Sequence, residues 1–267
     1  MIDYLLVPDY IGDLVVTLKD YFSKEPSLLE LKYDRVAIVG DTHGAIDVSS
    51  LAFDKLHEGY CVIMLGDLID RGPESLRNLV FSMEMKFLTD KVFIIRGNHE
   101  SSITPPYYGF LDELKENGID YLYDDFLSMF ASIPYGILLN EMILCLHGGI
   151  ASGEFNLEDI RNLRKGDIVP DDKRGFEILW NDPREFIEGF LPSTRAEGAY
   201  FFGRDVFEHF METNNLSHLI RGHEVKMNGI ADNFNGKLIT VFSSEYHGGK
   251  KGILILDNGK FIKIIRD

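Results

Sequence analysis

Five short segments of the chain each place an Asp, Asn or His beside a glycine, in order between residues 40 and 223. Four of the five follow an apolar, strand-like run. Polar side chains at the carboxyl ends of neighbouring strands meet at one edge of a sheet, so the pattern predicts one shared site and restricts how the strands can be arranged. The segments are Gly40-Asp41-Thr42-His43-Gly44, Gly66-Asp67-Leu68-Ile69-Asp70-Arg71-Gly72, Gly97-Asn98-His99-Glu100, His147-Gly148-Gly149 and Arg221-Gly222-His223.

The first part of the chain alternates apolar runs with helical segments. Residues 35–39, 61–65 and 91–95 are largely apolar and indicate buried strands. Helices are expected from the first turn to His57, and from Pro73 to about residue 88. This β-α-β-α-β order implies parallel strands joined by right-handed crossovers.

The remaining segments indicate a second half that is more antiparallel. The spacing of apolar residues predicts helical structure from about residue 10 to 31, and the stretch from 164 to 183 is expected to be rich in loops. Further helices are expected at residues 108–117, 123–132, 157–163 and 201–214, and further strands at 141–146, 219–221, 229–231, 237–242, 252–256 and 261–265. We therefore expect a mixed α/β (α+β) fold in one domain, residues 1–267, because no linker or repeat marks a boundary.

The charge balance restricts the partners of the chain. It has 27 Lys and Arg against 43 Asp and Glu, a formal net charge of −16. Because phosphate backbones require clustered basic residues, we expect no nucleic-acid binding. An anionic substrate would need strong local positive charge, which metal ions and a few Arg side chains can supply.

The two cysteines and the N-terminus indicate a cytoplasmic protein. Cys61 and Cys145 both lie inside apolar runs, which is typical of buried, inert thiols in a reducing compartment. The first residues lack the basic and apolar regions of a signal peptide, and no apolar run reaches the roughly 18 residues of a spanning helix. We therefore expect no membrane association.

The polar residues of the five segments are types that bind divalent metal ions. Asp41 and His43 alternate, so both can reach one point from a tight turn, and Asp67 at the next strand end can bridge two cations. Carboxylate, amide and imidazole ligands together suit Mn²⁺, Fe or Zn²⁺. Six ligands exceed what one open zinc site needs, but they suit two ions that clamp the oxygens of a phosphoryl displacement. The six are Asp41, His43, Asp67, Asn98, His147 and His223.

Each segment taken alone also has an ordinary structural interpretation. A Gly-Asp pair after a strand is often only turn chemistry, and a single His at a strand end is more often a hydrogen-bonded polar residue than a ligand. The repetition of the pattern at successive strand ends favours the metal site. His57, His209 and His218 lie outside such a context and are expected to be ordinary helix or loop residues.

The ordered set closely resembles the PPP family of serine/threonine phosphoprotein phosphatases, with the supporting stretches Tyr108–Leu114, Leu179–Pro183 and Phe242–Ser243. The resemblance covers roughly residues 34–257, and the short termini are similar to compact archaeal or bacterial members. It implies the calcineurin-like metallophosphoesterase fold, a central β-sandwich of two mixed sheets flanked by helices.

The resemblance also implies the roles of the metal ligands. One ion would be bound by Asp41, His43 and Asp67, and the second by Asp67, Asn98, His147 and His223. Mn²⁺ is the expected metal, with Fe and Zn²⁺ as alternatives. A hydroxide bound to both metals would attack the phosphorus of phosphoserine or phosphothreonine directly, without a phosphoenzyme.

Further residues are assigned by the same resemblance. His99 would protonate the leaving oxygen and would be oriented by Asp70. Arg71 and Arg195 would grip the phosphate. The expected substrate-binding residues are Arg71, Asn98, Arg195, Arg221 and Tyr246. Phosphoproteins are the expected partners, and the sequence does not identify a regulatory subunit.

Two alternatives remain open at this stage. A hydrolase of dinucleoside polyphosphates or other small phosphate esters shares much of the pattern, but it typically has Ala in place of Asp70 and Asp in place of Glu100. A catalytically inactive scaffold would be expected to lack ligands, and none of the six is missing. The loop Ser243–Gly248 also departs from the family pattern, because it is shorter and has no proline.

Overall fold

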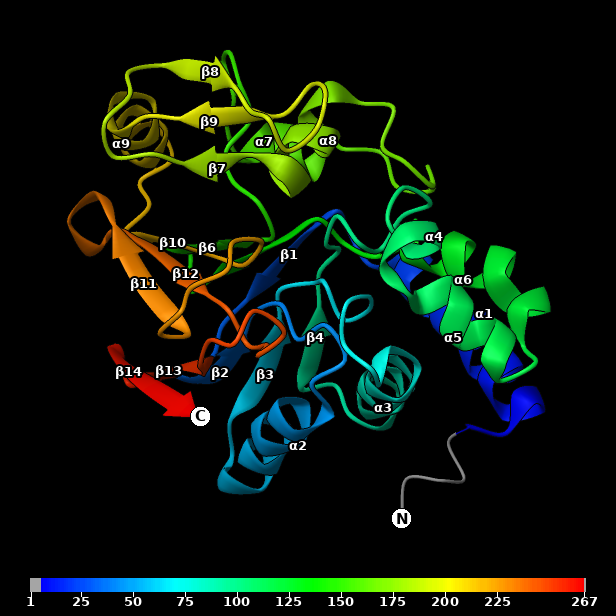
Figure 1. Ribbon diagram of the computed structural model, residues 1–267. Coiled ribbons are helices and arrows are strands. Elements are labelled where there is room, and N and C mark those ends of the chain that lie inside the picture. The colour runs from blue at the N-terminus through cyan, green and yellow to red at the C-terminus, as the bar shows by residue number, and fades with distance from the viewer. Residues whose placement is uncertain (1–5, 267) are drawn as a thin grey trace.

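The computed structural model describes residues 6–266, and Figure 1 shows them as a layered arrangement of sheets and helices. The helices are α1 (Pro8–Lys24), α2 (Ile46–Asp54), α3 (Ser75–Leu88), α4 (Pro105–Tyr108), α5 (Phe110–Glu116), α6 (Tyr123–Phe130), α7 (Leu157–Arg161), α8 (Lys173–Trp180) and α9 (Arg204–Thr213). None of the helices in this part of the chain is long and apolar enough to cross a membrane.

Two mixed sheets form the centre of the molecule. The first has the order β14 (Lys260–Arg266), β13 (Lys251–Asp257), β2 (Arg35–Val39), β3 (Cys61–Met64) and β4 (Val92–Ile94). The second has the order β1 (Leu28–Leu31), β5 (Gly136–Leu139), β6 (Ile143–Leu146), β10 (His218–Arg221), β12 (Leu238–Val241) and β11 (Ile230–Asn233). One apolar core contains side chains from both sheets, including Ile38, Ile63, Cys145 and Ile220, so the sheets form a sandwich.

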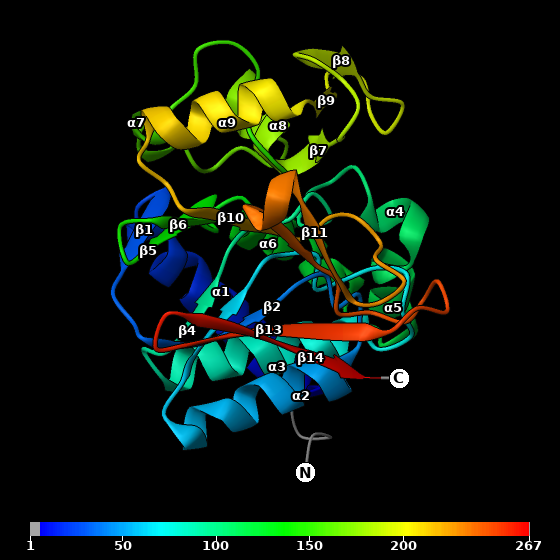
Figure 2. The same cartoon turned by 90° about the vertical axis from the view of Figure 1, so that its left-hand side faces the viewer.

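Helices cover the outer face of the first sheet. The core residues Val39 and Met64 alternate with those of the sandwich interior, and they pack against α1, α2, α3 and α6. Figure 2 shows α2 and α3 beneath this sheet. The parallel pairs β2–β3 and β3–β4 confirm the expected β-α-β-α-β unit.

A third layer lies over the second sheet. It contains α7, α8 and α9 together with a small sheet of β7 (Asp182–Pro183), β9 (Tyr200–Phe202) and β8 (Phe190–Pro192). These elements share an apolar core with the second sheet. Figure 2 shows them at the opposite side of the molecule from α2 and α3. The expected fold, two mixed sheets with flanking helices, is confirmed.

Three local expectations are wrong. Residues 28–31 form strand β1 rather than helix, because they pair with β5, more than a hundred residues away in the sequence. Residues 173–180 form helix α8 rather than loop; the Asp172 side chain caps it by accepting from the Arg174 and Gly175 amides. Phe201 and Phe202 lie in β9, and the helix after them begins at Arg204.

Buried polar bonds fix the turns that follow β2 and β3. Asn78 on α3 is fully buried, and its amide nitrogen donates to Thr42 Oγ1 and to the Leu68 carbonyl, both at 2.8 Å. Its amide oxygen accepts from the Ser49 hydroxyl on α2 at 2.6 Å. One side chain therefore connects both strand ends to the helices beneath them.

Asn78→Ala should lower the free energy of unfolding by about 2–4 kcal/mol, because it removes the hydrogen-bond partner of two buried hydroxyls, Thr42 and Ser49, and one of the two donors to the Leu68 carbonyl. Urea denaturation measures this directly. The control is Asn117→Ala at the exposed end of α5, which should cost less than about 1 kcal/mol. Equal losses in the two variants would contradict a structural role for Asn78.

Candidate metal centre

The strand ends of the two sheets converge on one buried centre. Asp41, Asp67 and Asn98 follow β2, β3 and β4, whereas His147 and His223 follow β6 and β10. The sheets are connected here by a bridge between Asp41 and Phe242. All five of the named polar side chains are at most 5 % exposed. Residues that are distant in the sequence are therefore brought to one point, as their positions at strand ends predict.

The turns at these strand ends have unusual backbone conformations. His43, Asp67 and His223 have φ values of 44°, 54° and 68°, in the left-handed region that non-glycine residues rarely adopt. A side chain on Gly97 would lie 2.3 Å from Asp67 Oδ1, so only glycine lets the two loops approach this closely. Strain of this kind is typical of functional sites that the surrounding structure holds in place.

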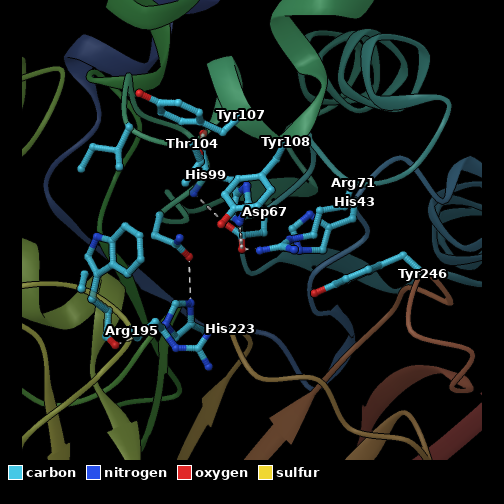
Figure 3. A pocket seen from close by; sticks show the side chains of 14 residues that line it. His43, Asp67, Arg71, His99, Thr104, Tyr107, Tyr108, Arg195, His223 and Tyr246 are labelled. Carbon is cyan, nitrogen blue, oxygen red and sulfur yellow. Dashed lines mark hydrogen bonds and ion pairs between the residues drawn. The ribbon is translucent and has the colours of Figure 1, made fainter.

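Two clusters of metal-ligating atoms share Asp67. In one, Asp67 Oδ2 lies 3.7 Å from His43 Nε2 and 3.9 Å from His99 Nε2. In the other, Asp67 Oδ1 lies 3.3 Å from His147 Nε2, and the cluster includes His223. Figure 3 shows Asp67 between His43 and His99. One carboxylate thus faces two adjacent positions for a cation.

Asn98 completes the second cluster. Its Oδ1 lies 2.9 Å from His147 Nε2 and 2.7 Å from His223 Nδ1. Asp41 belongs to neither three-residue cluster; its Oδ1 accepts from the His223 amide at 2.7 Å. Asp41 is buried beside the centre, and its assignment as a ligand remains a prediction.

The hydrogen bonds of two imidazoles leave one ring nitrogen of each available to a cation. His43 Nδ1 lies 2.7 Å from the Ile69 carbonyl, and His147 Nδ1 lies 2.8 Å from the Leu65 carbonyl. A carbonyl only accepts, so each Nδ1 is the protonated nitrogen and a neutral ring turns its Nε2 lone pair toward the centre. Lone pairs of imidazole, carboxylate and amide then face one another and repel. A positive ion bound between them would replace this repulsion by attraction.

Burial and neighbouring charges set the pKa values. Burial would raise the pKa of Asp67, but the imidazoles of His147 and His99 lower it well below its usual range. Burial would lower the pKa of His147, but the carboxylate of Asp67 raises it to about 9. Burial and the charge on Asp67 raise the pKa of Asp41 to about 6. The same surplus of acceptor atoms that favours a proton on His147 favours a metal ion.

Glu100 holds the loop of Asp67 in place. Its carboxylate is fully buried and accepts from the backbone amides of Asp67, Leu68 and Gly97 at 2.8–2.9 Å. Burial, followed by the charge on Asp67, raises its pKa to about 7. At the level of sequence, Glu100 served only to distinguish phosphoprotein phosphatases from hydrolases of dinucleoside polyphosphates. Its place at the end of the segment Gly97–Glu100, next to His99, was the available signal for this positioning role.

His99 and Asp70 form a buried pair. His99 Nδ1 lies 2.6 Å from Asp70 Oδ2, and the Phe110 amide donates to Asp70 Oδ1 at 3.1 Å. Burial would lower the pKa of His99, but Asp67 and the hydrogen bond to Asp70 raise it. The imidazole is therefore held in one orientation, with Nε2 toward the pocket beside Asp67.

Arg195 and Arg221 share one buried carboxylate. Asp182 accepts from Arg195 Nε at 2.9 Å and from Arg221 Nη2 at 2.8 Å. Arg195 lines the pocket, but Arg221 is fully buried behind it and also donates to the Gly148 carbonyl. This placement does not support the expected contact of Arg221 with substrate. Asp182 was not predicted as a site residue, although it lies within Leu179–Pro183, one of the stretches that carry the family resemblance.

A cavity of about 270 Å³ opens onto the centre. Figure 3 shows Arg71 and Tyr246 on one side of it, Arg195 and His223 on another, and Tyr107 and Tyr108 along its rim. The lining residues that the sequence predicted are His43, Asp67, Arg71, Asn98, His99, Arg195, His223 and Tyr246; those it missed are Ile103, Thr104, Tyr107, Tyr108, Trp180 and Ala196. The cavity therefore offers two guanidinium groups next to the two ligand clusters.

Comparison with known proteins agrees with this geometry. Residues 34–227 match the calcineurin-like phosphoesterase family. Serine/threonine-protein phosphatase T of Saccharomyces cerevisiae is 33% identical over 255 residues, which is 92% of this chain and 49% of that protein. A probable serine/threonine-protein phosphatase of Encephalitozoon cuniculi is 34% identical over 222 residues, which is 81% of this chain and 48% of that protein. The chain thus spans about half the length of these curated relatives.

A solved structure has nearly the same fold. The protein serine/threonine phosphatase from Saccharomyces cerevisiae with similarity to human phosphatase PP5 superimposes with a TM-score of 0.90 at 29% identity, and the match covers 98% of this chain and 90% of that chain. Both curated relatives are eukaryotic, so the expected likeness to archaeal or bacterial members remains a prediction. The chain belongs to the calcineurin-like phosphoesterase family, and its resemblance to the PPP serine/threonine phosphatases is confirmed.

Proposed function

We propose that this chain is a metal-dependent phosphatase that hydrolyses phosphoserine and phosphothreonine in proteins. The observation that carries the proposal is the pair of ligand clusters joined by Asp67, with the His99–Asp70 pair and two arginines around one cavity. The names of the two relatives, both serine/threonine-protein phosphatases, support the substrate class.

Two divalent ions fit the donor set. Asp41, His43 and Asp67 would hold one ion, and Asp67, Asn98, His147 and His223 would hold the other. When bound, the two ions would polarise the phosphoryl group and activate a water molecule as the nucleophile. The mixture of carboxylate, amide and imidazole supports Mn²⁺ as the native metal, with Fe or Zn²⁺ as alternatives.

The chain's own residues would bind the phosphate and move the proton. Arg71 and Arg195 present guanidinium groups to the cavity, and a guanidinium can donate to two phosphate oxygens in parallel. His99 Nε2 points into the cavity, and Asp70 fixes the opposite ring nitrogen. His99 would therefore donate a proton to the serine or threonine oxygen as the P–O bond breaks. Asn98 and Tyr246 would contact the substrate from the walls.

Two alternatives are less well supported. A hydrolase of dinucleoside polyphosphates is disfavoured because Asp70 is present and is hydrogen-bonded to His99. Glu100 also disfavours it, because its carboxylate accepts from three backbone amides, and the shorter side chain of Asp would not reach all three. An inactive scaffold is disfavoured because all six proposed ligands are present and buried.

The domain boundaries and the cellular compartment are part of the same proposal. We infer one catalytic domain over residues 1–267, because the apolar cores of the described residues 6–266 share elements across the whole span. The free, buried thiols of Cys61 and Cys145 support the proposal that the protein works in a reducing compartment, the cytoplasm. Phosphoproteins are the proposed partners.

A substrate panel tests the proposed function. Protein treated with a chelator should lose hydrolysis of phosphoserine and phosphothreonine peptides and regain it with Mn²⁺, because in the proposed mechanism the bound metal ions activate the attacking water. Under the same conditions, kcat/KM should be higher for these peptides than for a phosphotyrosine peptide or a dinucleoside polyphosphate. Full activity in metal-free protein would contradict the mechanism, and a preference for the dinucleotide would establish the alternative function.

His99→Asn should lower kcat for phosphoserine peptides by about 10²–10⁴-fold, because a serine alkoxide is a poor leaving group. The loss should be much smaller for p-nitrophenyl phosphate, whose leaving group needs little protonation. Asp70→Asn should give a smaller loss with the same substrate dependence. Metal content, measured by elemental analysis, is the control. If His99→Asn slowed both substrates equally, or lost its metals, His99 would not be the general acid.

A further inference from the structure

Arg71 and Arg195 are held in the cavity in different ways. Arg195 has an ion pair with the buried Asp182. Arg71, in contrast, has no ion pair with any carboxylate in the part of the chain that the structure describes, although it is one of the few cations near the centre of a strongly acidic protein. Its guanidinium instead lies 4.1 Å from the ring centroid of Tyr108 and 5.1 Å from that of Tyr246.

We propose that Tyr108 and Tyr246 are positioning residues that hold the Arg71 guanidinium between two aromatic rings. This inference rests on the proposed function, in which Arg71 binds the phosphate. A ring contacts the flat face of a guanidinium, whereas a carboxylate takes its N–H donors and cancels its charge. Two rings therefore fix the group and leave its charge and donors for a dianion. Figure 3 shows Arg71 with Tyr108 and Tyr246 close to it.

The backbone around Tyr108 supports the same role. Asp70 and Arg71 are consecutive non-glycine residues with left-handed φ values of 71° and 67°, which cost free energy unless neighbours hold them. The Arg71 amide donates to the Tyr108 carbonyl at 2.7 Å, and the Phe110 amide donates to the Asp70 carboxylate at 3.1 Å. Residues 108–110 thus hold both strained residues.

The same two tyrosines also contact the imidazoles of the centre. The ring of Tyr108 lies 5.5 Å from that of His99, and the ring of Tyr246 lies 5.1 Å from that of His43. The two rings come from α4 and from the loop between β12 and β13, so the phosphate-binding group is held from two independent parts of the fold. Neither ring needs its hydroxyl for this contact.

The test compares three variants in the metal-loaded protein. Tyr108→Leu removes the ring but keeps apolar bulk and the backbone bond to Arg71, whereas Tyr108→Phe keeps the ring. Tyr121→Leu is the matched control, because Tyr121 is 65% exposed in the 3-10 helix Asp120–Leu122 and does not line the cavity. Isothermal titration with inorganic phosphate and the KM for p-nitrophenyl phosphate are the measurements.

Tyr108→Leu should weaken phosphate binding and raise KM by about 5- to 30-fold, the range expected for a partly desolvated cation–π contact. Tyr108→Phe should stay within about 3-fold of the wild type, and Tyr121→Leu should bind phosphate as the wild type does. In an Arg71→Met background, the additional effect of Tyr108→Leu should fall below about 2-fold, because the cation that the ring holds is gone.

Equal phosphate affinity in Tyr108→Leu and Tyr121→Leu, or a full effect of Tyr108→Leu in the Arg71→Met background, would overturn the inference. If Tyr108→Leu does not fold, as judged by thermal denaturation, Tyr246→Leu provides the test from the other ring, with an expected loss of about 2- to 5-fold. Because Tyr246 would also contact the substrate, only the part of this loss that disappears in the Arg71→Met background counts for the positioning role. A wild-type protein that binds phosphate but hydrolyses no phosphate ester would refute the proposed function. The phosphate affinities of the Tyr108 variants and of Tyr121→Leu would still test the positioning role.

Discussion

The structure depends on one buried carboxylate, that of Asp67. Its two oxygens face two clusters of ligand atoms, 3.3–3.9 Å from the imidazoles of His147, His43 and His99. Because a carboxylate in this position is stable only with positive charge nearby, the surroundings of Asp67 require protons or metal ions. The left-handed turn at Asp67, the glycine at 97 and the buried Glu100 all keep this side chain at the junction of the two sheets.

The second constraint is the overall charge. A chain with a net charge of −16 repels a phosphate dianion, so the proposed site must concentrate positive charge locally. Two metal ions would supply most of it. The two arginines at the cavity are held by different means, Arg195 by an ion pair with Asp182 and Arg71 by two aromatic rings. In the proposed mechanism, this difference would leave the Arg71 guanidinium with its full charge available to the phosphate.

Sequence patterns predicted the parts of the fold that depend on local signals. The runs at 35–39 and 61–65 became β2 and β3, because buried parallel strands need continuous apolar residues, and the polar residues after them meet as expected. Strand β1 was missed because it is defined by pairing with β5, and short apolar runs do not distinguish strand from helix. Asp182 and Tyr108 were not predicted either, because each matters through a contact with a residue that is not its neighbour in sequence. Asp182 contacts Arg195 and Tyr108 contacts Arg71, and the local spacing of residues reveals neither contact.

The central claim is that Asp67 bridges two metal ions, and the metal content of Asp67→Asn tests it most directly. Asn has nearly the same shape and can still accept from the His99 amide, but it removes the negative charge between the two cations. After equilibration with Mn²⁺ and removal of the excess, elemental analysis should find two ions per chain in the wild type and in an exposed control, Asp112→Asn, and fewer than two in Asp67→Asn. Two tightly bound ions in Asp67→Asn would contradict the bridging role.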